Sequence, residues 1–272
     1  SAIADPKNEK IASVESGYVL NTPRVKARLS GYLTKFNDLT QTLTFYHDVY
    51  RNNVNYTLTD IDKINFGGEL GIEAKIYKGL TASLAAAVGR YYYTSRQKAT
   101  VTVDNSSDVL ASDEVIFSKF FKVGGTPQTA ATLGFNYRSP KYWFVSANVN
   151  YFDDMWLDFN PIRRTWTAVE SVPNPSDTYD QIIQQEKLKR QFTVDIFGGY
   201  SFKINSVLKK LKNPQYIYLN IGINNITNNK DLVTGGYEQL RFDFENSDVS
   251  KFPSRYFHAY GINYFFNVSY KF

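Results

Sequence analysis

The side chains that could carry out chemistry in this sequence are few and scattered. Cysteine is absent and there are only two histidines, His47 and His258. A metal site or a histidine-based triad needs a positioned cluster of such groups, and the spacing here provides none. We therefore interpret both histidines as isolated surface residues, and we expect no catalytic residue, no metal site, no cofactor and no enzymatic activity.

Aromatic and arginine side chains between the predicted strands are of the types that bind solutes. Rings can stack on a sugar, a haem or an aromatic siderophore, and guanidinium groups can clamp an anionic ligand. The candidates are Tyr92, Tyr93, Trp156, Arg163, Arg164, Trp166, Tyr237 and Arg241. The alternative is that residues 91–93 form an aromatic belt at a membrane interface and that the others only pack within loops. These residues single out no ligand class.

The elements that must hold these side chains alternate strictly between apolar and polar residues. The clearest is the stretch 258–272, which we expect to be one strand with an apolar, aromatic face and a small or polar face. In a transmembrane barrel, the apolar face meets lipid and the polar face meets the lumen. The mean hydropathy of −0.38 and the absence of a long apolar run exclude a transmembrane helix, whereas barrel strands need only every second residue to be apolar.

Nine such strands follow one another along the chain. We expect them at residues 11–20, 24–49, 55–77, 80–93, 129–137, 142–152, 191–204, 216–225 and 258–272. The turns after Leu20, Tyr77, Tyr137 and Ile204 are short or moderate, although residues 205–215 have room for one helical turn at 206–211. Most connections at the other end are long, as in outer-membrane barrels. Single-chain bacterial barrels have an even strand number, so an odd count predicts part of a larger barrel.

The charge of the chain does not point to nucleic acid. The net charge of +5 and the isoelectric point near 9.0 arise from 31 basic and 26 acidic residues that are interleaved along the sequence. A nucleic-acid-binding protein would concentrate its basic residues in a patch or stripe. The basic excess is therefore interpreted as a solvated surface.

Five segments resemble the C-terminal barrel part of a TonB-dependent outer-membrane receptor of the Bacteroidetes type. They are VESGYVL at 14–20, GGELGIEAK at 67–75, GGTPQTAATLGFNYRSPKYW at 124–143, NIGINNITN at 220–228 and YGINYFFNVSYKF at 260–272. The resemblance implies an all-β fold in which residues 1–272 are about nine C-terminal strands of a roughly 22-stranded barrel, with long extracellular loops. The plug and the N-terminal strands are expected to be absent from this chain.

The resemblance also implies roles for four residues. Glu15 and Glu69 match the two acidic positions of the inner barrel wall that bind arginines of the plug, where a charge-assisted bond would seat it. The alternative is that these carboxylates pair with neighbouring lumenal cations such as Arg28. Tyr270 and Phe272 match the aromatic C-terminal strand that forms part of the barrel assembly signal.

The function that the resemblance implies is active uptake of a scarce nutrient across the outer membrane. Siderophores, haem, glycans and peptides are the solute classes considered. The implied partners are the plug and remaining strands of the same protein, the TonB complex, outer-membrane lipid and a surface lipoprotein, with the C-terminus in the periplasm. Two alternatives are a complete small barrel enzyme of the lipase or protease type, and a soluble β-sandwich binding module in which the apolar faces meet each other.

Overall fold

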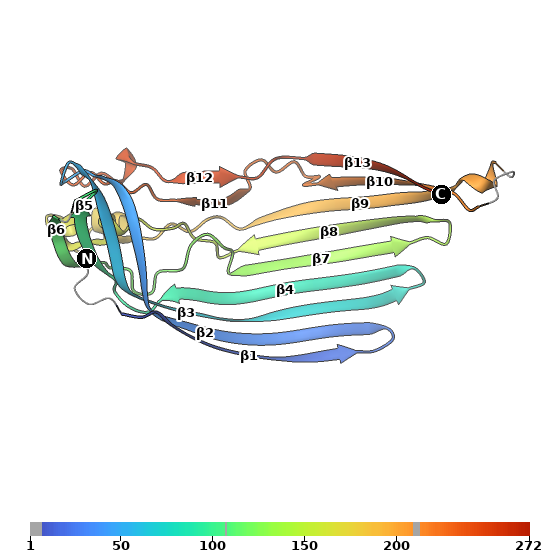
Figure 1. The fold of residues 1–272 in the computed structure, drawn as a ribbon, viewed down its shortest axis with the longest axis horizontal. Helices are drawn as coiled ribbons and strands as arrows, with labels where there is room; N and C mark the ends of the chain where they lie inside the picture. Colours follow the sequence, from blue (N-terminus) through green and yellow to red (C-terminus); the bar gives the residue numbers. More distant parts are fainter. Residues whose placement is uncertain (1–6, 107, 209–212) are drawn as a thin grey trace.

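The computed structural model describes residues 7–106, 108–208 and 213–272 and shows one long antiparallel sheet. Its main path contains nine strands in the order β1-β2-β3-β4-β7-β8-β9-β10-β13 (Figure 1). The strands of this path are β1 (Lys10–Asn21), β2 (Val25–His47), β3 (Asn52–Tyr77), β4 (Leu80–Tyr93), β7 (Thr129–Arg138), β8 (Trp143–Asp153), β9 (Gln191–Lys203), β10 (Tyr216–Asn224) and β13 (Asn263–Lys271). The predicted all-β fold and strand order are therefore confirmed.

The register of the sheet keeps the apolar residues of every strand on the same face. Leu29 of β2 pairs with Leu70 of β3, and Leu219 of β10 pairs with Val268 of β13. Because side chains alternate along a strand, correct pairing at one position places the whole apolar set on one side. We call this side the apolar face and the opposite side the inner face.

The connections at the two ends of the strands differ in length. At one end, β1–β2, β3–β4 and β7–β8 are joined by short turns, and Figure 1 shows these turns together on the right. Gly79 has a positive φ of 79°, and a Cβ there would lie 2.3 Å from the carbonyl oxygen of Arg138. The two-residue turn Lys78-Gly79 thus needs its glycine. The long connections gather at the opposite end.

The β2–β3 hairpin continues beyond the wall of the sheet. Asp38 and Asp60 adopt positive φ where the β2–β3 register shifts, as expected of β-bulges. Above the shifts, β3 no longer pairs with β4 and pairs with β5 (Lys98–Val103), which in turn pairs with β6 (Val109–Val115). Figure 1 shows the hairpin bending across the long-loop end towards the late strands.

The long connections fold together into a compact unit, which we call the cap. It comprises residues 39–61, 95–106, 108–121, 155–188 and 233–258. Its core is formed by hairpin residues such as Tyr56, by Val101 of β5 and by Ile116, Ile162 and Phe242 from the loops, all 2% exposed or less. Each segment alone is too short to bury an apolar core, so the cap depends on contacts between distant loops.

The described part of the chain also contains five short helices, and those in the cap begin at side chains that accept a free backbone N–H. They are η1 (Pro161–Arg164), α1 (Trp166–Val169), α2 (Asp177–Ile183), η2 (Ile204–Ser206) and η3 (Val249–Lys251), of which η2 lies at the short-turn end. Ser176 Oγ accepts the N–H of Tyr179 at 3.1 Å and caps α2. Asn160 Oδ1 accepts the N–H of Ile162 at 3.1 Å and caps η1.

The expected strand over residues 258–272 is wrong in its first part. β12 (Arg255–His258) pairs with β11 (Val233–Tyr237) in a separate sheet of the cap, and β13 begins only at Asn263. The wall ladder stops because β10 ends before Asn225, which has a positive φ of 50°. The Asn225 amide then donates to the carbonyl of Tyr260 at 3.3 Å, in place of a ladder partner.

Two smaller expectations also change. The helical turn expected at 206–211 starts earlier, as η2, and residues 209–212 lie outside the described residues. His47 is not a surface residue, because it is 5% exposed among the aromatic rings of the cap. His258 is exposed, as expected.

The soluble sandwich alternative requires the apolar face to be covered by a second sheet. Instead, Val145, Ile221 and Phe266 are 39%, 48% and 64% exposed. In the part of the chain that the structure describes, the edge strands β1 and β13 each pair with one neighbour, so the sheet does not close on itself. Within the same ranges, the helices are all too short or too polar to cross a membrane.

A lysine on the apolar face should destabilise the folded protein in lipid. Val149→Lys places a charge on this face and should cost about 2–4 kcal/mol at mid-bilayer depth. Asn148→Lys, one residue away on the inner face, is the control and should cost much less. Urea unfolding of the intact protein in lipid vesicles measures both. Equal losses for the two variants would contradict the assignment of the faces.

Candidate functional site

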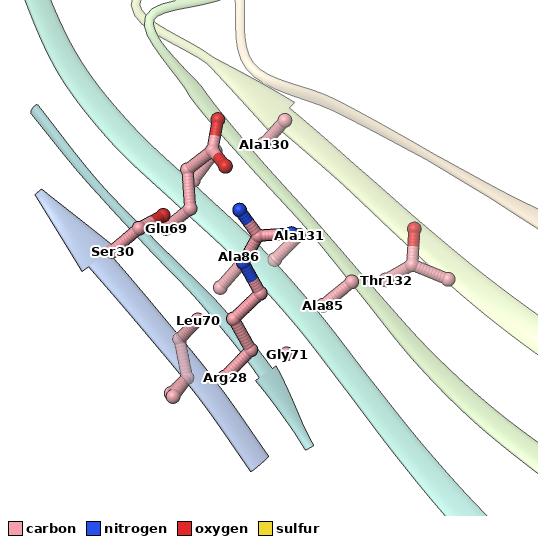
Figure 2. A pocket seen from close by; sticks show the side chains of 11 residues that line it. Arg28, Ser30, Glu69, Leu70, Gly71, Ala85, Ala86, Ala130, Ala131 and Thr132 are labelled. Carbon is pink, nitrogen blue, oxygen red and sulfur yellow. The ribbon is translucent and has the colours of Figure 1, made fainter. Parts of the chain in front are cut away.

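The inner face carries a hollow around one carboxylate. Glu69 of β3 lies in register with Ser30 of β2 and Ala87 of β4, and Ala87 pairs with Ala130 of β7. These small neighbours leave a hollow of about 360 Å³ beside the glutamate. Figure 2 shows the Glu69 carboxylate and the Arg28 guanidinium projecting from the sheet over the alanines. The sheet thus presents an exposed acid on an otherwise small-residue surface.

The two predicted acidic residues have different surroundings on this face. Glu15 of β1 has an ion pair with Arg28 at 3.8 Å, in which both side chains are more than half exposed. Glu69 forms no ion pair within the residues that the structure describes. Glu69 is therefore the more available anion, whereas Glu15 already has the lumenal cation that the alternative interpretation named.

A tyrosine pair borders the hollow on the side towards the cap. The hydroxyls of Tyr32 and Tyr91 hydrogen-bond to each other across β3. A Cβ at Gly67 would lie 2.7 Å from the Tyr32 hydroxyl, so only glycine lets this ring cross the strand. Gln128 fixes Tyr91 by exchanging two hydrogen bonds with its backbone, at 2.9 and 3.1 Å. The upper border of the hollow is thus built by specific contacts.

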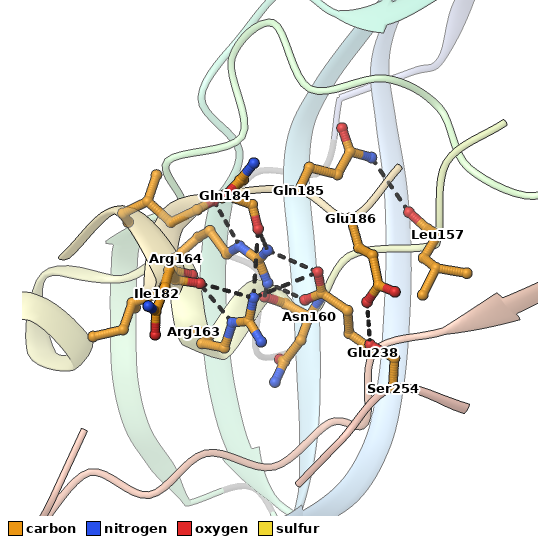
Figure 3. Close-up of polar contacts among 12 residues, drawn as sticks. Leu157, Asn160, Arg163, Arg164, Ile182, Gln184, Gln185, Glu186, Glu238 and Ser254 are labelled. Atoms are coloured by element: carbon orange, nitrogen blue, oxygen red, sulfur yellow. Dashed lines mark hydrogen bonds and ion pairs between the residues drawn. The ribbon is translucent and has the colours of Figure 1, made fainter. Parts of the chain in front are cut away.

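The two arginines predicted as an anion clamp lie inside the cap. Arg164 is fully buried and forms a bidentate ion pair with Glu238, which is 3% exposed (Figure 3). Its remaining N–H groups donate to the carbonyls of Asn160, Ile183 and Gln184. No part of this guanidinium reaches an open surface. It fastens η1 and α2 to the segment after β11.

Arg163 has the same structural role from the neighbouring position. It is 9% exposed, and its Nε donates to the carbonyl of Ile182 at 3.1 Å. Burial beside Arg164 lowers its pKa to about 10 even though Glu238 lies 3.6 Å away. The clamp for an anionic ligand is therefore not available at either arginine in this structure.

The aromatic candidates separate into different places. Tyr92 lies on the apolar face with Phe66, their ring centroids 6.4 Å apart, as expected of the interface-belt alternative. Trp166 is 65% exposed on α1, and Trp156 lies under the Lys187 ammonium. Tyr93 and Tyr237 line one common hollow, of about 260 Å³, in the cap.

Arg241 connects the segment after β11 to the tip of the β2–β3 hairpin. Its guanidinium binds the carboxylate of Asp48 at the tip of the β2–β3 hairpin, with the shorter contact at 2.5 Å, and it lies 4.2 Å from the centre of the Phe252 ring. Next to this contact, His47 packs 4.6 Å from Tyr50 and 5.8 Å from Phe244 between ring centroids. The hairpin tip is therefore held by residues that lie far away in the sequence.

The structure adds site residues that the sequence did not single out. Asp158 and Gln97 line the same cap hollow as Tyr93 and Tyr237. Neither residue lies in a motif, and they come together only because residues 158–160 dock against residues 237–241. No sequence signal marks them beyond their position in the long insertions. Tyr270 and Phe272 lie at the exposed end of β13, where the Tyr270 hydroxyl donates to Gln215 at 2.7 Å.

Known protein structures share this fold. No protein-family model and no curated protein sequence matches the chain. The copper transporter OprC superposes with a TM-score of 0.55 at 14% identity, over 97% of this chain and 32% of its own. The FrpB iron transporter from Neisseria meningitidis, in its F3-3 variant, superposes with a TM-score of 0.51 at 16% identity, over 98% and 32%. This chain therefore spans about a third of the length of these structures, and its fold is that of a β-barrel segment.

Removing one partner of the buried ion pair should unfold the cap selectively. Glu238→Ala leaves Arg164 charged and unpaired in the core, which typically costs about 3–5 kcal/mol. Limited proteolysis of the intact protein should then cut residues 155–188 much faster, while the wall strands stay protected. Glu245→Ala, which removes an exposed acid, is the control. Resistance to cleavage equal to that of the wild type would contradict this role of the pair.

Acid should loosen the hairpin tip through His47. Burial lowers the pKa of His47 from its ordinary 6.5, although Asp48 opposes the shift. The unfolded state therefore binds more protons in this range, so stability is lost as the pH falls below about 6.5. In addition, the Val49 N–H donates to His47 Nδ1 at 3.3 Å, which requires the neutral ring.

His47→Phe keeps an aromatic ring but cannot titrate, so the cap of this variant should lose less stability between about pH 7 and pH 5 than that of the wild type. Thermal unfolding followed at both pH values measures the difference. His258→Gln removes the exposed histidine and should leave the pH dependence unchanged. An unchanged pH dependence in His47→Phe would exclude His47 as its source.

Proposed function

We propose that this chain is part of the wall of an outer-membrane active transporter, of the TonB-dependent receptor type that the sequence resembles. The observation that carries the proposal is an open barrel arc whose apolar face is exposed and whose inner face presents Glu69 in a hollow of small residues. The structural likeness to a copper transporter and an iron transporter supports transport. Such transport needs positioned binding groups and no catalytic residue.

The unpaired edges of the sheet support a larger barrel. In lipid, every backbone N–H and C=O needs a partner, so the outer edges of β1 and β13 cannot face the hydrocarbon. We propose that further strands of the same protein pair with both edges and complete a roughly 22-stranded wall. Residues 1–272 are then one part of a single barrel domain.

Glu69 is proposed to seat the plug of this transporter. An arginine of the plug would fit the exposed carboxylate, and the alanines around it leave room for the guanidinium. Glu15 would contribute less, because it already has an ion pair with Arg28. The plug in turn would connect the barrel to the TonB complex, whose pull admits the solute.

The difference between the two ends of the strands supports an orientation. Outer-membrane barrels have short periplasmic turns and long extracellular loops. We propose that the cap faces the outside, that the C-terminus lies in the periplasm and that the aromatic end of β13, with Tyr270 and Phe272, acts in barrel assembly. A surface lipoprotein of the kind found with Bacteroidetes receptors would approach the cap.

The uptake function is tested by accumulation in cells. A strain that lacks the intact protein should lose energy-dependent accumulation of at least one radiolabelled solute from a panel of ferric siderophores, haem, oligosaccharides and peptides. A protonophore should abolish the same uptake in the parent strain. Uptake that persists with the protonophore would indicate a passive pore and contradict the proposal.

The plug contact is tested at Glu69. Glu69→Ala should weaken plug seating by about 1.5–3 kcal/mol, the value of a hydrogen bond to a charged group. Planar bilayers with the intact protein should then show channel opening at a lower urea concentration. Glu73→Ala removes another acid of the same inner face and is the control. Channel opening at the same urea concentration in both variants would contradict a plug contact at Glu69.

A further inference from the structure

We infer that the cap hollow is a binding site for a ligand that presents hydroxyl or ammonium hydrogen-bond donors. The hollow lies between the upper β2–β3 hairpin, the end of β4 and the docked segments 158–161 and 237–240. Its volume of about 260 Å³ is slightly below the roughly 300–1,000 Å³ typical of sites for drug-sized ligands, so it suits a very small molecule or one unit of a larger solute. The inference rests on the proposed function, since it takes the cap as the face that meets the solute.

Two acceptor groups at the hollow, on Asp158 and Gln97, have no hydrogen-bond partner among the described residues. The Asp158 carboxylate has no ion pair or hydrogen bond among the described residues, and partial burial raises its pKa. Asp158 is an exposed residue that lines the hollow. Gln97 is 2% exposed, and its Oε1 has no hydrogen-bond partner. A buried acceptor without a partner costs free energy, so its retention calls for a donor that this chain does not supply.

The other carboxylate at the hollow is already neutralised. Glu238 is engaged by Arg164 and accepts the N–H of Asn160 at 2.9 Å. It therefore helps to build the wall and is not free to bind a ligand. Asp158 remains as the acid that a ligand can reach, which favours donors and disfavours anionic ligands.

The apolar part of the hollow is aromatic. The rings of Tyr93 and Phe159 meet edge to face, 5.6 Å apart between centroids, and Tyr237 is 44% exposed at the same hollow. Aromatic faces attract organic cations and cover the apolar side of a ligand. The hydroxyl of Tyr93 makes no hydrogen bond among the described residues, and its pKa is raised by burial and by the nearby Asp158 carboxylate.

The backbone around the hollow holds Asp158 in place. Asp158 forms an isolated parallel β-bridge with Tyr237, and the Asp158 carbonyl accepts the N–H of Glu238 at 3.0 Å. The Asn160 amide donates to the carbonyls of Gln239 and Arg241, at 2.8 and 3.0 Å. A Cβ at Gly124 would lie 2.5 Å from Asp158 Oδ1, so this glycine leaves space for the carboxylate. The backbone that carries this acceptor is thus fixed by contacts within the chain.

Binding of two probes to the intact purified protein tests the inference. Putrescine presents ammonium donors, maltose presents neutral hydroxyl donors, and inorganic phosphate is the anionic comparison. We expect calorimetry to detect putrescine or maltose and not phosphate. Asp158→Ala should weaken that binding about ten- to a hundredfold, as expected for loss of a hydrogen bond to a charged group. Asp158→Asn distinguishes ammonium from hydroxyl ligands, because loss of the negative charge should weaken the binding of putrescine far more than the binding of maltose.

Two further variants distinguish loss of binding from loss of folding. Gln97→Leu removes the unpartnered acceptor and should retain or raise the thermal stability of the cap while binding is weakened. Asp231→Asn removes an exposed acid elsewhere and should bind as the wild type does. Binding of neither probe, preference for phosphate, or unchanged binding by Asp158→Ala would overturn the inference.

The outcome is independent of the uptake test. Energy-dependent uptake without Asp158-dependent binding would refute the site and leave the transporter proposal standing. Asp158-dependent binding without energy-dependent uptake would support the site and refute transport.

Discussion

The structure depends on an unbroken antiparallel ladder whose register keeps one face apolar from β1 to β13. A shift by one residue in any pair would move a whole set of apolar side chains to the inner face. The ladder also satisfies the backbone polar groups of all strands except those at the two outer edges. Both the exposed apolar face and the proposed completion by further strands follow from this single arrangement.

The inner face and the cap are both built on this ladder, but the first keeps an acid accessible and the second packs distant loops together. Along the wall, small residues around Glu69 keep an acid accessible. At the long-loop end, the bulges at Asp38 and Asp60 let the hairpin leave the wall and bend over its end, where distant loops pack against it. The Arg164–Glu238 pair then fixes the loops relative to one another. The cap hollow arises only from this assembly.

The wall could be predicted from the sequence because alternation is a local signal. The pairing of Leu133 with Val149 follows from the residue types and the short turn between β7 and β8. The cap could not be predicted, since its contacts join positions such as Asp48 and Arg241, which lie 193 residues apart. For the same reason, the sequence suggests Arg164 as a binding group for an anionic ligand and does not single out Asp158. The last wall strand begins at Asn263 and not at residue 258 as predicted, because apolar and polar residues continue to alternate before the point where β10 can pair with them.

The central claim is that alternate residues of these strands face lipid and an aqueous lumen. The chain has no cysteine, so single cysteines can be introduced without background. The most direct measurement is labelling of cysteines placed one at a time along β10 in native membranes, with a membrane-impermeant and a lipid-soluble maleimide. The account predicts that positions 218, 220 and 222 react with the impermeant reagent and that positions 217, 219 and 221 react only with the lipid-soluble one. Uniform labelling, or the reverse pattern, would contradict it.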